Sequence, residues 1–279
     1  MWLKTCVEGI YSWLSCFETR VSDTGSPLPS IVHKSLKLNE LKKRLFIVSD
    51  VHGCLDEVET LLKKISYSPD TTSVVFVGDL VAKGPKSAET ISWLMQQVGM
   101  HAVRGNHEDN ALLAIHKPGS KYAKKDTYRF VRFLSKDEKE FIKELPVTIS
   151  IPELQLLVVH AGLDPAKRGH SLQAQAFSDL IRIRCVDKTG NSSNKNPKEG
   201  ELYLWGSSYV GPPFVVFGHD AKRKQQSHAW ARGIDTGCVY GGSLTGLLIK
   251  DTRDVQNWME NIEIVSVPAA KVYVRPDDD

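Results

Sequence analysis

The stretch that decides the fold is Phe46-Ile-Val-Ser-Asp-Val-His-Gly-Cys54, a short apolar run that ends in two polar side chains. Its β-branched residues and the glycine after it predict a buried strand over residues 45–50. Asp50 and His52 lie one residue apart, so the two-residue period of an extended chain points both to one side. A carboxylate and an imidazole there suit a metal ion, although an Asp that merely caps a strand explains this stretch equally well.

Four further stretches deliver polar side chains at the ends of apolar runs. One ends in Gly-Asp79, and another leads into Gly-Asn106-His107-Glu, which offers an amide oxygen beside an imidazole. Two more runs end in His160 and His219. In any single case a buried, hydrogen-bonded side chain is the commoner explanation. Five strands that all end in Asp, Asn or His favour one shared metal site instead.

The alternation of apolar runs with helical patterns predicts an α/β domain in which ligands bind at the carboxyl ends of the strands. A chain of 279 residues with 41% hydrophobic residues is long enough for one large domain with a proper core. We expect strands over 45–50, 73–78, 101–105, 155–160, 214–218 and 244–249. We expect helices over 55–65, 87–98, 108–116 and 171–184, and a polar loop over 187–200.

Two segments stand apart from this alternation. Residues 1–43 predict an amphipathic helix, over the first twenty residues, followed by a linker, and residues 44–279 form the main domain. Residues 117–146 are highly charged with helical spacing, which predicts a helical cap inserted over the site. The N-terminal helix either packs on the domain or associates with a membrane surface, since it lacks the features of a signal peptide.

Charge and cysteine content limit the cellular setting. The formal net charge of +3 is too small to indicate DNA binding, and the five cysteines show no paired spacing typical of disulfides or structural zinc. Reduced thiols indicate a cytoplasmic protein.

The ligand set contains nitrogen and oxygen without sulfur, which suits divalent Mn, Co, Zn, Fe or Mg. Six ligands are too many for one tetrahedral ion, so they predict two ions that share a bridging carboxylate. Such a centre typically acts on phosphate esters or anhydrides, and hydrolysis is the expected reaction.

In order along the chain, Asp50-Val-His-Gly, Gly-Asp79-Leu-Val-Ala-Lys-Gly, Gly-Asn106-His-Glu, His160 and Gly-His219 resemble the calcineurin-like metallophosphoesterases of the PPP type. That family has a β-sandwich flanked by helices. Gly-Asp-Leu-Val-Ala-Lys-Gly-Pro, Leu180-Ile-Arg-Ile-Arg184 and Gly233-Ile-Asp-Thr-Gly-Cys-Val-Tyr-Gly-Gly242 further resemble the symmetrical diadenosine tetraphosphatase ApaH and the ApaH-like phosphatases. The resemblance covers residues 44–250.

The resemblance implies a role for each matching residue. It assigns Asp50 and His52 to one metal ion and Asp79 to the bridge. It assigns the second ion to Asn106, His160 and His219. His107 is then the general acid for the leaving oxygen, or the group that stabilises its charge.

One motif departs from the protein Ser/Thr phosphatases, which carry Asp-Arg where this chain has Ala82-Lys83. The missing Asp would orient the catalytic histidine, so His107 must be held otherwise, by Glu108, by Asp109 or by backbone. Lys83 offers a flexible point charge in place of a bidentate fork. We expect it to bind substrate phosphate, with a solvated loop lysine as the alternative.

Three more residues are assigned to the substrate. Guanidinium groups bind phosphate oxygens bidentately, so Arg182 and Arg184 are expected to hold the phosphate chain, the alternative being a surface pair. Tyr240 offers a ring face or a hydroxyl, although a packing role is as plausible. Five cap cations should guide a polyanion: Lys121, Lys124, Lys125, Arg129 and Arg132.

The predicted substrate is a dinucleoside polyphosphate. The alternatives are an endopolyphosphatase, a messenger-RNA-decapping enzyme that acts on capped RNA, and a protein Ser/Thr phosphatase. A scaffold without catalysis is disfavoured because all the expected ligands are present.

Overall fold

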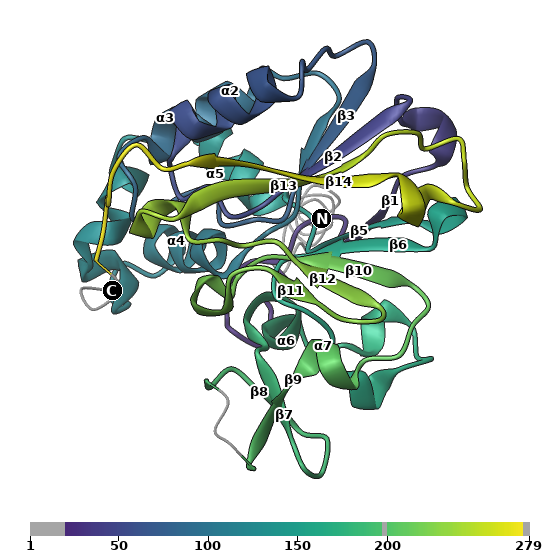
Figure 1. Ribbon diagram of the computed structural model, residues 1–279. Coiled ribbons are helices and arrows are strands. Elements are labelled where there is room, and N and C mark those ends of the chain that lie inside the picture. Colours follow the sequence, from purple (N-terminus) through teal and green to yellow (C-terminus); the bar gives the residue numbers. More distant parts are fainter. Residues whose placement is uncertain (1–19, 197–199, 276–279) are drawn as a thin grey trace, which may run out of the picture.

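Two β-sheets pack face to face, and helices cover their outer sides (Figure 1). This computed structural model describes residues 20–196 and 200–275. The amphipathic helix predicted near the N-terminus lies outside the described residues. In the described ranges, no helix combines the length and the apolar character that a membrane crossing requires.

The first sheet has five strands in the order β14-β13-β2-β3-β4. Strands β2, β3 and β4 are parallel, β13 pairs antiparallel with β2, and β14 pairs antiparallel with β13. The bounds are β2 (Arg44–Val48), β3 (Thr72–Phe76), β4 (Met100–Ala102), β13 (Ser243–Ile249) and β14 (Ile262–Pro268).

The second sheet has six strands in the order β1-β5-β6-β10-β12-β11. They are β1 (His33–Ser35), β5 (Thr148–Ile151), β6 (Leu156–Val159), β10 (Phe214–Phe217), β11 (Gln226–Ser227) and β12 (Ala231–Gly233). Strand β1 pairs with β5, so the linker predicted before residue 44 is wrong at this point. Leu36 is buried in the core between the sheets, which explains why this polar-looking segment is fixed.

Alternation along β2 explains the layers. Leu45 and Ile47 enter the core between the two sheets, whereas Phe46 and Val48 face the helices. The helices on this side are α2 (Leu55–Lys64), α3 (Ser87–Met95) and α4 (Asn106–His116). A third core lies between the second sheet and α6 (Phe177–Arg182) and α7 (Trp205–Ser208). The predicted β-sandwich flanked by helices is therefore confirmed.

The segment predicted as a helical cap follows α4. It contains η2 (Tyr122–Lys124), η3 (Asp126–Arg132) and α5 (Lys136–Glu144), and the first two are 3-10 helices. Tyr128, Val131 and Leu134 pack into the core against α4, which fixes the segment. The remaining 3-10 helices are η1 (Leu38–Glu40), η4 (Pro152–Leu154), η5 (Pro165–Lys167), η6 (Leu172–Ala174), η7 (Ala221–Arg223), η8 (Cys238–Tyr240) and η9 (Trp258–Asn261).

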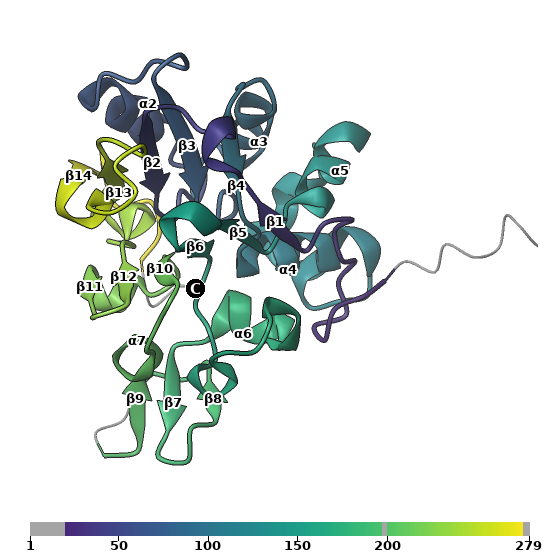
Figure 2. The same cartoon turned by 90° about the vertical axis from the view of Figure 1, so that its right-hand side faces the viewer.

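A small third sheet projects below the sandwich (Figure 2). It consists of β7 (Cys185–Asp187), β8 (Ser192–Ser193) and β9 (Leu202–Leu204). The loop predicted over residues 187–200 is therefore partly a hairpin, whose turn forms because the Asp187 carboxylate accepts hydrogen bonds from Thr189 and Asn191. The helix predicted over 171–184 is also shorter than expected, because α6 begins only at Phe177 and ends at Arg182.

Candidate metal and phosphate site

The register of the parallel strands brings the predicted ligands to one edge of each sheet. Val48 of β2 pairs with Phe76 of β3, so Asp50 and Asp79 leave the first sheet side by side. In the second sheet Val158 of β6 pairs with Val216 of β10, which places His160 beside His219 in the same way. Residues that follow the paired ends of parallel strands therefore lie close together in space.

Two glycines allow carboxylates to lie against the backbone. A Cβ atom on Gly105 would be 2.2 Å from Oδ1 of Asp79, and one on Gly218 would be 1.9 Å from Oδ1 of Asp50. No side chain fits at such distances. Asp79 itself has φ 47°, a left-handed conformation that non-glycine residues adopt at a cost and that is common at functional sites.

Asp79 lies between two histidines. Its Oδ2 atom is 3.5 Å from Nε2 of His52 and 3.4 Å from Nε2 of His160. Nδ1 of His52 is 3.1 Å from the carbonyl oxygen of Val81, and Nδ1 of His160 is 3.0 Å from that of Val77. Because a carbonyl only accepts, each Nδ1 carries the proton and each Nε2 turns its lone pair toward Asp79. A carboxylate flanked by two imidazole lone pairs is a donor set that suits a divalent metal ion.

Asn106 and His219 complete the group around His160. Oδ1 of Asn106 is 3.0 Å from Nε2 of His160, so two atoms that both present lone pairs face each other. Nε2 of His219 is buried without a hydrogen-bond partner among the described residues. Asp79, His160 and His219 each offer one ligand atom, all within 4.8 Å of one another. Buried acceptors that converge without a proton between them fit a divalent cation.

Asp50 reaches this group from the end of β2. Both of its oxygens lie 3.1 Å from the backbone N–H of His219, which donates to them. Burial, reinforced by the charges of Asp235 and Asp79, raises the pKa of Asp50, and burial lowers the pKa of His52. Crowded carboxylates beside neutral imidazoles are the electrostatic condition that a bound cation relieves.

Glu108 does not hold His107, as one of our alternatives had it, because its carboxylate binds backbone. Its oxygens accept hydrogen bonds at 2.7–3.1 Å from the N–H groups of Asp79, Leu80, Val81 and Gly105. The other acidic alternative, Asp109, pairs with Arg182 at 2.9 Å. Neither carboxylate therefore replaces the residue that is missing at Ala82.

Tyr128 of the cap contacts His107 instead. Its hydroxyl is 2.9 Å from Nδ1 of His107, and the two rings stack with centroids 5.9 Å apart. His107 also belongs to a group with His52 and Asp79 whose ligand atoms lie within 4.8 Å of one another. Sequence reasoning missed Tyr128, since its helical spacing indicated only a core position.

The site opens into a cavity of about 740 Å³. Lys83 and Tyr240 line it together, and Nζ of Lys83 donates to the Tyr240 hydroxyl at 2.6 Å. Arg182 and Arg184 also line it, from the junction between α6 and β7. All four residues predicted to contact substrate thus face one space.

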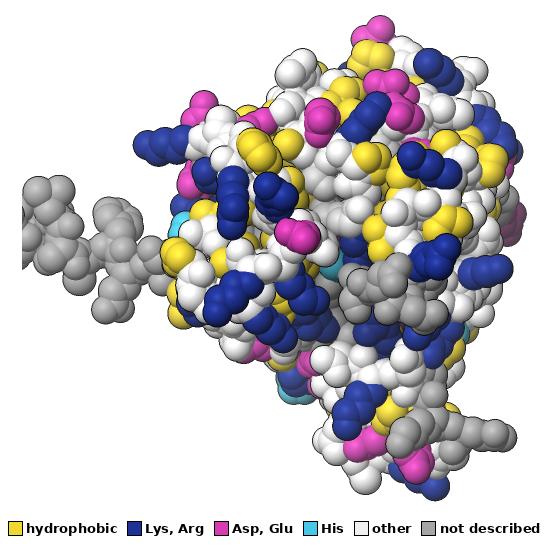
Figure 3. All heavy atoms as spheres, turned by 90° about the vertical axis from the view of Figure 1, so that its left-hand side faces the viewer, with side chains coloured by type: hydrophobic (Ala, Val, Ile, Leu, Met, Phe, Trp, Pro, Cys, Tyr) yellow, Lys and Arg dark blue, Asp and Glu magenta, His cyan; other side chains and the backbone are white. Residues whose placement is uncertain are grey.

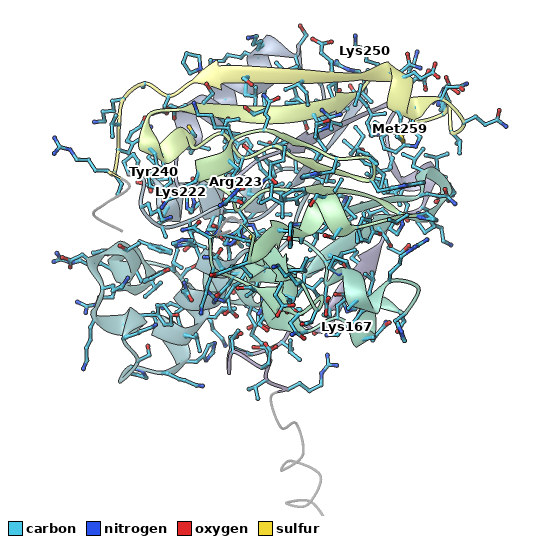
Figure 4. All side chains as sticks on the ribbon, turned by 60° about the horizontal axis from the view of Figure 1, so that its bottom comes forward. Lys167, Lys222, Arg223, Tyr240, Lys250 and Met259 are labelled. Carbon is cyan, nitrogen blue, oxygen red and sulfur yellow. The ribbon has the colours of Figure 1, made fainter. Side chains whose placement is uncertain are left out.

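Two cations that the sequence analysis overlooked, Lys222 and Lys224, line the same cavity. Figure 3 shows Lys and Arg side chains gathered on this face, and Figure 4 shows Lys222 and Arg223 next to Tyr240. By contrast, none of the five cap cations is among the described residues that line the cavity. The expectation that the cap guides a polyanion with those charges is therefore not supported.

Asp235 is a further site residue that we missed. Phe217 of β10 pairs with Gly233 of β12, so Asp235 leaves its strand at the level of His219. It lines the cavity, and burial raises its pKa to about 7. The signal was the same as for the candidate ligands, a strand that is followed by a polar side chain, but the strand is only three residues long.

Comparisons with known proteins agree with this geometry. The sequence model of the family described as calcineurin-like phosphoesterase matches residues 43–236. The chain is 30% identical over 251 residues to a bis(5'-nucleosyl)-tetraphosphatase PrpE, named as asymmetrical, from Halalkalibacterium halodurans, covering 82% of this chain and 95% of the relative. Its identity to the protein of the same name from Bacillus subtilis is 28%, covering 81% and 95%.

Solved structures show the same likeness. The crystal structure of a candidate diadenosine tetraphosphatase superimposes with a TM-score of 0.70 at 29% identity, covering 86% of this chain and 98% of that one. A protein serine/threonine phosphatase from Saccharomyces cerevisiae has a TM-score of 0.58 at 17% identity, covering 88% and 85%, and shows the fold alone.

Proposed function

This chain belongs to the calcineurin-like phosphoesterase family, and from that premise we propose that it hydrolyses phosphoanhydride bonds of dinucleoside polyphosphates with two divalent metal ions. The observation that carries the proposal is the position of Asp79. Its carboxylate lies between the Nε2 atoms of two histidines, next to a cavity lined with cations.

The candidate ligands would divide into two sets that share the carboxylate of Asp79. Asp50 and His52 would hold one ion, and the second set consists of Asn106, His160 and His219. Divalent ions at these positions supply Lewis-acid stabilisation of a phosphoryl group and lower the pKa of a water molecule. The donor set of neutral imidazole, carboxylate and amide oxygen excludes none of Mn, Co, Zn, Fe or Mg.

The chain's own cations bind the phosphate groups. Lys83 contributes a point charge that the Tyr240 hydroxyl fixes in place. Arg182 and Arg184 present planar guanidinium groups to the same cavity, which suits the oxygens of a phosphate chain. His107 lies beside Asp79 and donates a hydrogen bond or a proton to the leaving oxygen.

The number of cations that line the cavity supports a substrate with several phosphates. Lys222 and Lys224 line it together with Lys83, Arg182 and Arg184. A phosphomonoester carries too little charge to engage all five. A polyphosphate chain with a nucleoside at each end offers a phosphate group to several of them.

Product analysis tests the proposal. The purified protein is incubated separately with Mn, Co, Mg and Zn and offered diadenosine tetraphosphate, long-chain polyphosphate, capped RNA and a phosphopeptide. We expect the highest kcat/KM for diadenosine tetraphosphate. Two molecules of ADP would show symmetrical cleavage, and AMP with ATP would show the asymmetrical cleavage named for the relatives.

The control for contaminating phosphatases is Asp79→Asn prepared in parallel. A phosphopeptide turned over faster than any polyphosphate would overturn the proposal. Activity that is equal in the Asp79→Asn preparation, or that survives removal of divalent ions by a chelator, would do so as well.

A further inference from the structure

The cap brings a buried tyrosine to the ring of His107. Tyr128 is 4% exposed, and its hydroxyl lies 2.9 Å from Nδ1 of His107. Its ring stacks on the imidazole at an interplanar angle of 25°. Position 82, where the protein phosphatases carry an acid, is alanine here. The Tyr128 hydroxyl, and not an acid at position 82, therefore contacts Nδ1 of His107.

A second contact sets the direction of the hydrogen bond. An Arg182 guanidinium N–H donates to Oδ1 of Asn110 at 3.0 Å, which fixes the amide with its NH₂ group on the other side. That NH₂ group donates to the Tyr128 hydroxyl at 2.9 Å. The hydroxyl oxygen therefore accepts from Asn110 and can direct its own hydrogen to Nδ1 of His107.

We propose that Tyr128 is a positioning residue for the hydrolysis proposed above, because it holds His107 with Nδ1 as the acceptor and Nε2–H directed into the cavity. Only the effect of Tyr128 on the reaction rate rests on the proposed hydrolysis; its effect on the orientation of His107 does not. Nε2–H then donates a hydrogen bond to the oxygen that leaves the phosphorus, where negative charge develops. A neutral phenol that donates a hydrogen bond to the histidine ring thus orients it, as a carboxylate that accepts a hydrogen bond orients it in the protein phosphatases.

The same contacts connect substrate binding to this ring. Arg182 lines the cavity and also orients Asn110, so a guanidinium expected to bind phosphate lies at the start of the chain Arg182, Asn110, Tyr128, His107. Each member is fixed by the one before it. Substitution of Asn110 should therefore leave His107 less well oriented, although the side chains of His107 and Tyr128 are both unchanged.

Nitrogen NMR of the histidine rings tests the proposal without any enzymatic activity. Protein labelled with 15N at histidine is compared as wild type and as Tyr128→Phe, with His107→Gln used to assign the signals. We expect an unprotonated Nδ1 and a protonated Nε2 for His107 in the wild type, and a shift of the Nδ1 signal of His107 in Tyr128→Phe. Protonated Nδ1 in the wild type, or identical signals in the two proteins, would overturn the proposal.

Kinetics test the consequence for the reaction. Tyr128→Phe keeps both ring contacts and removes one hydroxyl, and Tyr122→Phe removes a hydroxyl from a neighbouring cap tyrosine whose ring lies 5.7 Å from that of Tyr128. Phenyl phosphate has a basic leaving group that needs a hydrogen bond, whereas p-nitrophenyl phosphate does not. In Tyr128→Phe we expect kcat to fall about tenfold for phenyl phosphate, part of the roughly 10²- to 10⁴-fold that a complete acid-base contribution supplies, and less than about twofold for p-nitrophenyl phosphate, with KM unchanged.

Tyr122→Phe should behave as wild type. Equal losses on both esters, or a change in KM alone, would assign Tyr128 a purely structural role. If Tyr128→Phe does not fold, Asn110→Ala serves as the second variant and should show the same dependence on the leaving group. A wild-type protein that hydrolyses neither these esters nor diadenosine tetraphosphate would contradict the proposed function, while the NMR result would still decide the role of Tyr128.

Discussion

Reversal of the charges of two lining lysines tests whether the cavity binds a polyphosphate. Lys222 and Lys224 are both exposed and both line the cavity. The lining contains five cations (Lys83, Arg182, Arg184, Lys222 and Lys224) and three carboxylates (Asp79, Asp220 and Asp235), for a formal sum of +2 when the histidines are neutral. The double variant Lys222→Glu/Lys224→Glu changes this sum by −4, to −2.

The size of the effect follows from Coulomb's law. A phosphate charge about 8 Å from a lining charge interacts with about 0.5 kcal/mol in water, so a change of four charges costs about 2 kcal/mol per phosphate charge before screening. Screening over a Debye length of about 30 Å at 0.01 M salt leaves about 1.6 kcal/mol, or about a 15-fold loss of kcat/KM. At about 0.1 M salt about 0.9 kcal/mol remains, or about fivefold.

The assay measures kcat/KM for diadenosine tetraphosphate and for p-nitrophenyl phosphate at both salt concentrations. The matched control is Lys124→Glu/Lys125→Glu, which makes the same change of charge at two exposed cap positions outside the cavity lining. We expect the loss only for the polyphosphate and only in the cavity variant. Equal losses in both variants, or an equal loss on the chromogenic ester, would refute the reasoning.

Three further outcomes are expected. Asp79→Asn should lower turnover at least about a hundredfold while unfolding stays cooperative, because the bridging charge is lost, and a near-normal rate would exclude the bridge. Lys83→Ala should lower kcat/KM about tenfold or more for every phosphate substrate with little change in Tm, since a charged hydrogen bond contributes about 1.5–3 kcal/mol, and unchanged kinetics would make Lys83 a solvated loop residue. The pKa of His101 is lowered by burial, and then by the charge of Lys34, from 6.5 to about 4, so the unfolded chain binds more protons between these values and stability falls as pH falls through them. Between about pH 7 and pH 5 the free energy of unfolding should therefore fall further in wild type than in His101→Gln, by about 1 kcal/mol after allowance for solvent screening of this partly exposed ring. Urea unfolding of both proteins at both pH values measures this difference.

The proximity of the candidate metal ligands was predictable from sequence because parallel strands end at a common edge. Asp50, Asp79, His160 and His219 each follow an apolar run, and strand register places Asp50 beside Asp79 in one sheet and His160 beside His219 in the other. Asp235 follows the same rule and was missed because its strand is short and contains Arg232. Alternation of apolar and polar residues is weak evidence for a strand when it covers only three residues.

The partner of His107 and the two further lining cations, Lys222 and Lys224, were not predictable. Tyr128 lies 21 residues from His107 in the sequence, and its hydroxyl reaches the ring only because the cap packs on α4. Lys222 and Lys224 lie in an exposed basic stretch whose composition does not distinguish a cavity wall from a solvated surface. Pairing of β1 with β5 depends in the same way on a long-range contact.

The four backbone N–H groups bound by Glu108 have a consequence for the order of assembly. They belong to the loop that carries Asp79 and to the turn that begins α4, so one buried side chain fixes both before any ion binds. Folding should therefore precede metal loading, and the folded protein should exchange one divalent ion for another without unfolding. Which divalent metal is bound would then depend on the concentrations of the divalent ions around the protein.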